Sequence, residues 1–568
     1  MPTFSSNLRS IFWIALAVRI AHVLCLQAAP FGDYLVGDAA RYDAWAREIA
    51  RGNWLGNEVF YQAPLYPYLL GLVYATLGDS LLLIRLLQAL LGAGTCGLVA
   101  ATGQRLFGER AGWWAGLSMA VYAPAIFLEG LLQKSALDLF FVALSMWLLS
   151  RLLVQDRARG WFALGTTTAA LALTRENALL AIPLLMLWMV WRPGLATGWR
   201  AITAERTRRL VGFAGGLAAL LIPVAARNAY VGGEWHLTTS QVGPNFYIGN
   251  HPTASGTYAP LATGRGDARY EAVDARQIAE AAVGRELTAG EVSKYYLDRS
   301  WQFMREQPVA WLALLAKKTA LALNRFELVD TEDQYTVAGW SPVLRVCDVV
   351  GNFGWLLPLA VIGIWLSRHD WRRLWWAYAL IAVMLGTMVV FFVFGRYRLP
   401  VAPLLALFAG CAIEQAGQVI TAGRGSWRAA IRTWCPAALR QPLLTGTILL
   451  LLVVGRWPLV DRGEARAVTL ANYGAIALTR GEFAEAEKFL MQAVELQPRF
   501  VEAQNNLGVL YRFRGEPRLA EVCFRRALEI APDYTNARTN LDAVAKDERL
   551  PISRQPPEKS AAARPGAR

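Results

Sequence analysis

The chain has 568 residues, and 55% of them are hydrophobic, against ~45–50% in ordinary soluble proteins. The apolar residues gather in long runs, which indicates membrane-spanning helices rather than one large soluble core. The net charge of +14 does not indicate a nucleic-acid partner, because arginines gather in short loops between the apolar runs and no nucleic-acid-binding motif is present.

The six cysteines and four histidines are dispersed along the chain, without a CxxC pair. The sequence therefore predicts neither a disulfide framework nor a zinc site. It leaves open whether a divalent metal takes part in the function of the chain.

Apolar runs predict about eleven membrane spans. The first follows Arg9 and is either a retained span or a cleaved signal peptide. We favour a retained span because others follow, and both alternatives place the next loop outside the cytoplasm. The predicted spans are 11–29, 80–102, 112–128, 136–153, 161–173, 178–191, 210–225, 344–366, 375–394, 400–420 and 443–460.

Arginines alternate between the two sides of this predicted topology. They concentrate in the loops at 105–110, 151–159, 192–209, 368–373 and 424–440, which we assign to the cytoplasm by the positive-inside rule. Two long loops, 30–78 and 227–342, then lie on the outer side, together with everything after residue 460. The second of them contains an amphipathic stretch, 308–325, that suits a membrane surface.

The C-terminal part repeats itself at a period of about 34 residues, the spacing of tetratricopeptide repeats. Recurring pairs are Gly474 and Gly508, Gly481 and Gly515, Ala486 and Ala520, and Pro498 and Pro532. We predict an α-helical repeat solenoid over 466–548, after a transmembrane domain over 1–460 and before a disordered tail over 549–568. The solenoid is either a stabilising cap or a groove for a protein partner.

Ionisable residues stand at the predicted outer ends of several spans. Asp38 begins a predicted amphipathic helix in the first outer loop, where its simplest role is that of a helix N-cap. Glu129 and Lys134 lie among apolar residues, and Arg396 and Arg398 share one edge of a span. Paired arginines match the oxygens of a phosphate, so this face suits an anionic lipid head group.

Four stretches together resemble a known family. They are Gly37-Asp38-Ala39-Ala40-Arg41-Tyr42 with the helix that follows, Ala63-Pro64-Leu65-Tyr66-Pro67-Tyr68-Leu69, Leu173-Thr174-Arg175-Glu176-Asn177, and Arg396-Tyr397-Arg398-Leu399-Pro400. In this order they resemble the bacterial GT-C membrane glycosyltransferases, within them the protein O-mannosyltransferase and aminoarabinose-transferase group (glycosyltransferase family 39-like). The resemblance covers residues 11–420, and a tetratricopeptide extension also occurs in bacterial members.

The resemblance implies an all-α, polytopic GT-C fold and an inverting transfer of a hexose or pentose from a polyprenyl-phosphate donor. Asp38 matches the position of the family's catalytic carboxylate and would deprotonate the acceptor hydroxyl. Lys134, Arg396, Arg398 and Arg175 would bind the donor phosphate, and Glu129 would orient the acceptor or a divalent metal. Further substrate-site candidates are Tyr42, Asp43, Tyr61, Tyr66, Asn250 and His251.

One departure from the family concerns Ala39. Several relatives carry an adjacent Asp-Glu pair in the first loop, whereas Asp38 is followed here by alanine. The acceptor therefore stays open among protein, lipid and glycan, and Asp43 is a fallback base. We expect a multi-pass protein of the bacterial cytoplasmic (inner) membrane, in contact with membrane lipids, with its long loops and repeats in the periplasm.

Two other functions remain as alternatives. A transporter or flippase of lipid-linked sugars would place ionisable groups at mid-membrane and interrupt its helices. A non-enzymatic envelope assembly scaffold would act through the repeats alone and tolerate substitution of Asp38. The charges at span ends and the two long outer loops favour the transferase.

Overall fold

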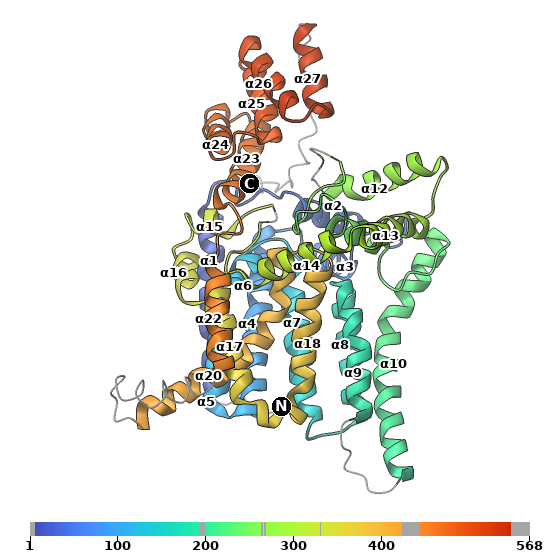
Figure 1. Ribbon diagram of the computed structural model, residues 1–568, viewed down its shortest axis with the longest axis vertical. Helices are drawn as coiled ribbons and strands as arrows, with labels where there is room; N and C mark the ends of the chain where they lie inside the picture. Colours follow the sequence, from blue (N-terminus) through green and yellow to red (C-terminus); the bar gives the residue numbers. More distant parts are fainter. Residues whose placement is uncertain are drawn as a thin grey trace, which may run out of the picture.

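In the computed structural model the described residues are 6–191, 199–262, 265, 268–329, 331–422 and 442–546. Over this part the chain is built from helices, with one isolated bridge between Thr257 and Val393. A bundle of long apolar helices carries a helical repeat domain at one end (Figure 1). The predicted all-α architecture is confirmed. The predicted arginine loop 424–440 and the tail 549–568 lie outside the described residues.

Each predicted apolar run coincides with helix, but not every helix is long enough to cross a membrane. Seven are long and apolar enough: Asn7–Ala28, Leu81–Phe107, Ser135–Leu152, Ile202–Gly232, Pro342–Leu366, Arg368–Val390 and Gly395–Gln418. The run at 112–128 is a pair, α5 (Glu109–Ala120) and α6 (Ala123–Gly130), bent by 50°. The runs at 161–173, 178–191 and 443–460 form shorter helices, so the count of about eleven crossings stays a prediction.

The helices that build the site have these bounds: α1 (Ser6–Ala28), α2 (Asp38–Ala50), α3 (Leu65–Leu77), α4 (Leu81–Phe107), α7 (Ser135–Leu152), α8 (Ala158–Ala172), α9 (Ala181–Trp191), α10 (Trp199–Gly232), α18 (Trp371–Val390) and α20 (Ala402–Ala422). Small residues let them approach closely. A Cβ at Gly165 on α8 would lie 2.1 Å from the carbonyl oxygen of Phe213 on α10, so glycine is required at this crossing.

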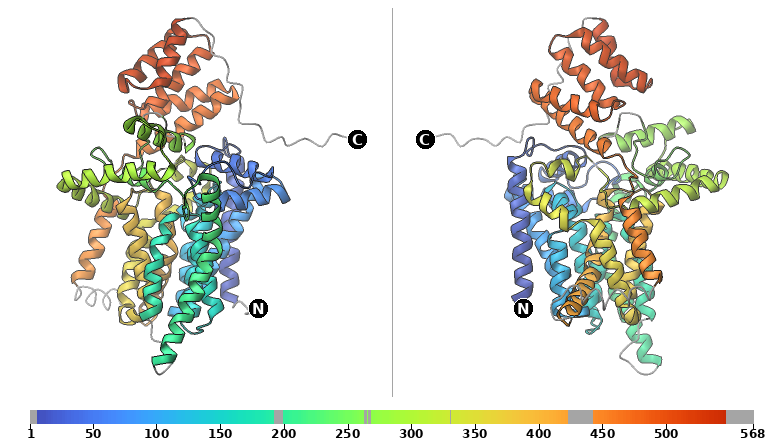
Figure 2. Two further views of the ribbon diagram at one scale, coloured as in Figure 1. Left: turned by 90° about the vertical axis from the view of Figure 1, so that its right-hand side faces the viewer. Right: turned by 60° about the vertical axis from the view of Figure 1, so that its left-hand side comes forward.

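Both predicted outer loops lie at the end of the bundle that carries the repeats, whereas the N-terminus lies at the opposite end (Figure 2). The first loop contributes α2 and α3. The second contributes α11 (Val242–Gly249), α12 (Ala268–Val283), α13 (Ala289–Glu306), α14 (Pro308–Leu323) and α15 (Gln334–Val337). The arrangement agrees with the alternation deduced from the arginines, and which side of the membrane this end faces stays a prediction.

The repeat domain comprises α23 (Arg462–Arg480), α24 (Phe483–Leu496), α25 (Val501–Phe513), α26 (Pro517–Ile530) and α27 (Thr535–Ala545). Its period has a structural cause. A Cβ at Gly474 would meet Leu490 at 2.5 Å, and one at Gly508 would meet Phe524 at 2.4 Å, so each repeat needs glycine where its two helices touch. Gly481 and Gly515 both adopt φ of 76°, in the left-handed region that ends each first helix.

Candidate functional site

Asp38 stands at the first turn of α2, directly after Gly37, whose φ of 57° favours glycine. The helix begins at Asp38 itself, Gly37 is its N-cap, and no side chain caps it. The simple N-cap role for Asp38 is therefore wrong. Instead the carboxylate is 7% exposed, accepts a hydrogen bond from Gln62 Nε2 (3.0 Å) and forms an ion pair with Arg396.

The electrostatic surroundings of Asp38 keep it ionised. Burial acts to raise the pKa of its carboxyl, but the charge and hydrogen bond of Arg396, the hydrogen bond from Gln62 and the charge of Lys134 outweigh burial. The pKa therefore lies below the ordinary value, so a buried carboxylate is available as a proton acceptor.

Arg175 holds the segment that carries Arg396. Its guanidinium donates two hydrogen bonds to Asp138 Oδ2, at 2.9 and 2.7 Å, and a third to the backbone carbonyl of Arg396 at 3.2 Å. It also lies 5.0 Å from the ring of Tyr397. Arg175 and the backbone of Arg396 are thus adjacent, and a common role of the two side chains in binding an anion stays a prediction.

Lys134 is buried just before α7, and its ammonium makes no hydrogen bond or ion pair with the part of the chain that the structure describes. It lines a polar cavity, together with Arg175, Glu176, Asn177, Gln241, Asn245 and Tyr397. Glu176 accepts hydrogen bonds from Gln241 and Thr239, at 2.8 and 3.1 Å, on the wall of this cavity. A buried ammonium with its donors unused is a binding group for an anion.

An apolar cavity lies next to the polar one, among α7, α8, α9 and α18. Its wall includes Leu149, Leu171, Leu185, Leu380 and Met384. Arg175, Asn177 and Tyr397 line both cavities, so the apolar and the polar space meet at these three residues. The pair is shaped for an amphiphile with a long apolar chain and an anionic head.

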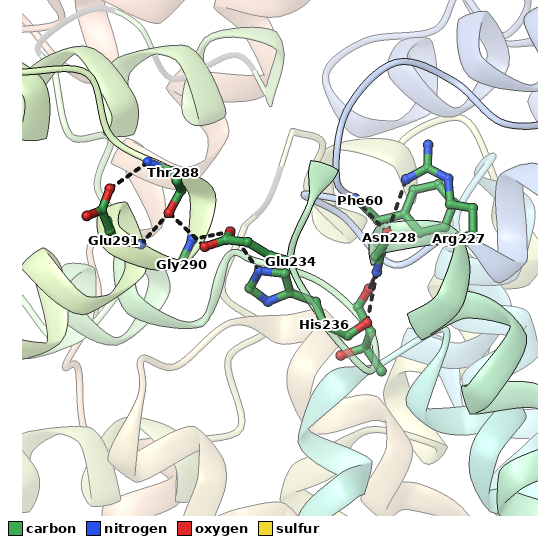
Figure 3. A network of polar contacts seen from close by, with 9 residues as sticks. Phe60, Arg227, Asn228, Glu234, His236, Thr288, Gly290 and Glu291 are labelled. Atoms are coloured by element: carbon green, nitrogen blue, oxygen red, sulfur yellow. Dashed lines mark hydrogen bonds and ion pairs between the residues drawn. The ribbon is translucent and has the colours of Figure 1, made fainter. Parts of the chain in front are cut away.

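A third cavity lies between the first outer loop and α12–α13. Its walls are joined by a polar network (Figure 3): Glu234 accepts from Thr288 Oγ1 and Gly290 N, at 2.7 and 2.9 Å, and Asn228 Oδ1 accepts from Phe60 N at 3.2 Å. The hydroxyl of Tyr61 is buried at this cavity and has no partner among the described residues. The next residue, Gln62, donates a hydrogen bond to Asp38, so residues 61 and 62 connect the wall of the third cavity to the carboxylate.

Glu129 and Arg398, two of the predicted site residues, lie in buried ion pairs of their own. Glu129 contacts Arg19 of α1 at 2.5 Å, and a Cβ at Gly92 would collide with both. Arg398 contacts Glu327 at 2.6 Å and donates to backbone carbonyls after α14. These contacts favour a structural role for both side chains, and their predicted catalytic and phosphate-binding roles remain untested.

The remaining predicted residues divide between the site and its supports. The ring of Tyr42 packs on Tyr66, with centroids 5.3 Å apart, beneath α2. Asp43 accepts from Arg47 at 2.9 Å and from Tyr74 at 2.6 Å, so it faces away from Arg396. Asn250 bonds the carbonyls of Phe246 and Val390, and His251 stacks on Tyr247. Of this group, Tyr61 borders the third cavity.

Gln62 and Asp138 were missed from the sequence. Gln62 lies in the aromatic and proline-rich stretch after α2, where nothing distinguishes it from a loop residue. Asp138 lies one turn after Lys134 inside an apolar helix, and a carboxylate at such a place is a signal for a functional partner. Among the described residues, no three His, Cys, Asp or Glu side chains gather closely enough to hold a metal ion.

Comparison with known proteins supports a glycosyltransferase. Residues 61–225 match the family described as dolichyl-phosphate-mannose-protein mannosyltransferase, and residues 467–500 and 501–534 each match a tetratricopeptide repeat. Residues 61–225 are thus similar to this glycosyltransferase family, and tetratricopeptide repeats follow near the C-terminus, which confirms the predicted resemblance. The comparison with curated proteins gave no match.

Solved structures of an oligosaccharyltransferase from Archaeoglobus fulgidus are distantly similar. The apo form has a TM-score of 0.43 and 13% identity over 88% of this chain and 61% of that one. The complex with an inhibitory peptide and a dolichol-phosphate has a TM-score of 0.42 and 14% identity over 88% and 60%. This chain thus spans about three fifths of the length of those proteins, and the similarity is too low to carry an argument about its site.

Proposed function

We propose that the chain is an inverting glycosyltransferase that moves a sugar from a polyprenyl-phosphate donor to an acceptor hydroxyl. The observation that carries the proposal is the meeting of the apolar and polar cavities at Arg175 and Tyr397, next to the Asp38–Arg396 ion pair. The family match at 61–225 supports glycosyl transfer from a lipid-linked donor.

The donor would lie across both cavities. Its polyprenyl chain would occupy the apolar space among α7, α8, α9 and α18, where the hydrophobic effect favours burial. Its phosphate would lie in the polar space and accept hydrogen bonds from Lys134 and Arg175. This leaves the sugar near the ion pair, on the same side as the long outer loops.

The acceptor would approach from the third cavity, past Tyr61. Asp38 would take the proton of the acceptor hydroxyl while that oxygen forms a bond to the anomeric carbon. The bond between the anomeric carbon and the phosphate oxygen breaks on the opposite face and its electron pair stays on the phosphate, so the configuration inverts. Lys134, Arg175 and Arg396 would stabilise the charge that develops on the leaving phosphate.

We place this site at the periplasmic face of a bacterial cytoplasmic membrane, with residues 1–460 as the catalytic domain and 466–548 as the repeat domain. The arginines at 105–110, 151–159 and 368–373, at the opposite end of the bundle, support this orientation. Hexoses and pentoses are equally compatible with the polar cavity, and the acceptor is a protein, a lipid or a glycan.

The test is a comparison of envelope lipids, glycans and proteins by mass spectrometry. Cells with the chain, without it, and with Asp38→Asn would be compared. We expect one sugar mass to be missing from one class of molecule in both deficient strains. Uptake of a labelled lipid-linked sugar into sealed vesicles without any glycosylated product would instead favour the flippase. Loss of function on deleting the repeats, with Asp38→Asn silent, would favour the scaffold.

A further inference from the structure

The segment between α14 and α15 contacts two parts of the molecule. One is the set of residues next to Asp38 and Arg396, and the other is the repeat domain. We call its residues 327–329 and 331–333 the strap. We propose that the strap transmits the docking of the repeat domain to Asp38 and Arg396, so that the repeats act as a positioning element of the active site. This rests on the proposed function.

The first contact of the strap is with the residue before Arg396. The backbone N–H of Gly395 donates to the carbonyl of Leu328 at 3.2 Å, and a Cβ at Gly395 would lie 2.7 Å from that oxygen. One residue earlier, Glu327 contacts Arg398 at 2.6 Å. The strap therefore holds the short α19 (Gly395–Arg398), which carries Arg396, from two sides.

The second contact is with the residue before Asp38. Gly37 adopts a left-handed φ of 57°, and a Cβ there would lie 2.6 Å from Thr331 Cγ2. The close approach leaves the backbone of Gly37 little room to move while Thr331 is in place. The two halves of the ion pair, which are 358 residues apart in sequence, thus rest on one segment.

The third contact joins the strap to the repeats. Asn472 Nδ2 donates to the carbonyl of Thr331 at 2.8 Å, and Asp333 N donates to Thr469 Oγ1 at 2.9 Å. Asn472 and Thr469 lie one turn apart on α23, which Figure 1 shows directly above α15. Asn506 and Asn540 follow Asn472 at the repeat spacing, so each repeat has an asparagine at this position. In the first repeat this asparagine contacts the strap.

The repeats also hold the chain before Asp38. Phe31, a non-glycine residue at φ of 61°, lies between Tyr473 and Phe489 of the repeats, with ring centroids 5.7 and 5.9 Å away. Asp33 contacts Arg480 at 2.7 Å. A residue keeps an unfavourable backbone conformation only where the surrounding structure holds it there. For Phe31 that structure is α23 and α24. The repeat domain thus contacts the chain before Asp38 directly, and it contacts Gly37 and α19 through the strap.

The test compares variants at equivalent positions of the first two repeats. Asn472→Ala and Thr469→Val each remove one hydrogen bond to the strap. Asn506→Ala removes the same side chain one repeat later, where within the described part of the chain it accepts a hydrogen bond from Asn505 and does not contact the strap. Hydrogen exchange of the full chain is measured for peptides that contain Gly395 and Gly37. We expect at least fivefold faster exchange in the first two variants and unchanged exchange in the control.

The second measurement is transfer from the polyprenyl-phosphate-linked sugar. We expect Asn472→Ala to lower kcat at least fivefold with the donor KM within twofold, because the donor cavities are untouched. A lowered Tm with unchanged exchange at Gly395 and Gly37 would overturn the strap and leave the repeats as a stabilising cap. Equal effects in Asn506→Ala would overturn it as well. If the unaltered protein transfers no sugar, the proposed function fails, and the exchange result still decides the strap.

Discussion

Replacement of Asp38 by asparagine tests the proposed base directly. The change keeps the size of the side chain and one oxygen that can accept from Gln62, but it removes the charge that pairs with Arg396. An asparagine cannot take the acceptor proton. Loss of a general base lowers rates by about 10²–10⁴-fold, so we expect kcat to fall by about 10³, or about 4 kcal/mol of transition-state stabilisation.

Two further variants separate charge, position and helix stability. Asp38→Glu keeps the charge but displaces the carboxylate by one methylene, and a displacement of about 1 Å can cost about 10²-fold. Asp43→Asn is the matched control on the same helix, because Asp43 contacts Arg47 and Tyr74 rather than the site. We expect its activity to stay within twofold of the unaltered protein.

The assay measures transfer of labelled sugar from the lipid donor in membranes that contain equal amounts of each variant. Thermal unfolding of the purified proteins shows whether Asp38→Asn is folded. Transfer by a folded Asp38→Asn variant at more than a tenth of the normal rate would refute Asp38 as the base. An equal loss of transfer in Asp43→Asn would show that the loss comes from a disturbed α2 and not from removal of the Asp38 carboxylate.

Three other substitutions address the cations. Lys134→Met removes an ammonium that has no hydrogen-bond or ion-pair partner among the described residues and that we assign to the donor phosphate. The value of kcat/KM for the donor should therefore fall by about 10–100-fold, and an unchanged value would exclude Lys134 from the donor site. Arg396→Gln removes the main charge that lowers the pKa of Asp38 against the effect of burial. The pKa of Asp38 should therefore rise, and the acid limb of the pH–rate profile should move to higher pH. An acid limb at the same pH would contradict the pairing of Asp38 with Arg396. Arg398→Met leaves Glu327 buried without its ion-pair partner, so the free energy of unfolding should fall by about 3–5 kcal/mol in thermal unfolding, with an unchanged donor KM. A raised donor KM with unchanged stability would instead show that Arg398 binds the donor phosphate.

The sequence was most informative where a pattern follows from a strong physical constraint. Apolar runs and arginine-rich loops predicted the helices and the common end of the two long loops, because lipid tolerates few alternatives to apolar helices. The repeat period predicted the solenoid, because glycine is required at Gly474 and Gly508, where paired helices touch. The sequence was less informative about span lengths, since α8 and α9 are shorter than a full crossing.

The sequence could not separate site cations from structural ones. Arg396 and Arg398 are two residues apart and chemically identical, yet one contacts Asp38 and the other Glu327. Glu129 resembled a site carboxylate because it lies among apolar residues, and its partner Arg19 lies 110 residues away on α1. Such long-range pairing leaves no local pattern. The same holds for the strap, whose contacts join three distant parts of the chain.

The charges at the site give a reason for the contact between Arg396 and the proposed base, Asp38. In the proposed reaction Asp38 loses its negative charge as it gains the acceptor proton, while the donor phosphate, singly charged as a diester, gains one as the sugar leaves. The total charge near Lys134, Arg175 and Arg396 therefore stays constant, and only its position changes. A guanidinium that presents several donors can keep one on Asp38 and turn another to the phosphate as the charge moves. Arg175 donates a hydrogen bond to the backbone carbonyl of Arg396. This contact fixes the backbone position of Arg396 and leaves the donors of its guanidinium available. Because the charge never leaves the reach of these cations, the buried site does not have to accommodate a net change of charge, which would be costly at low dielectric.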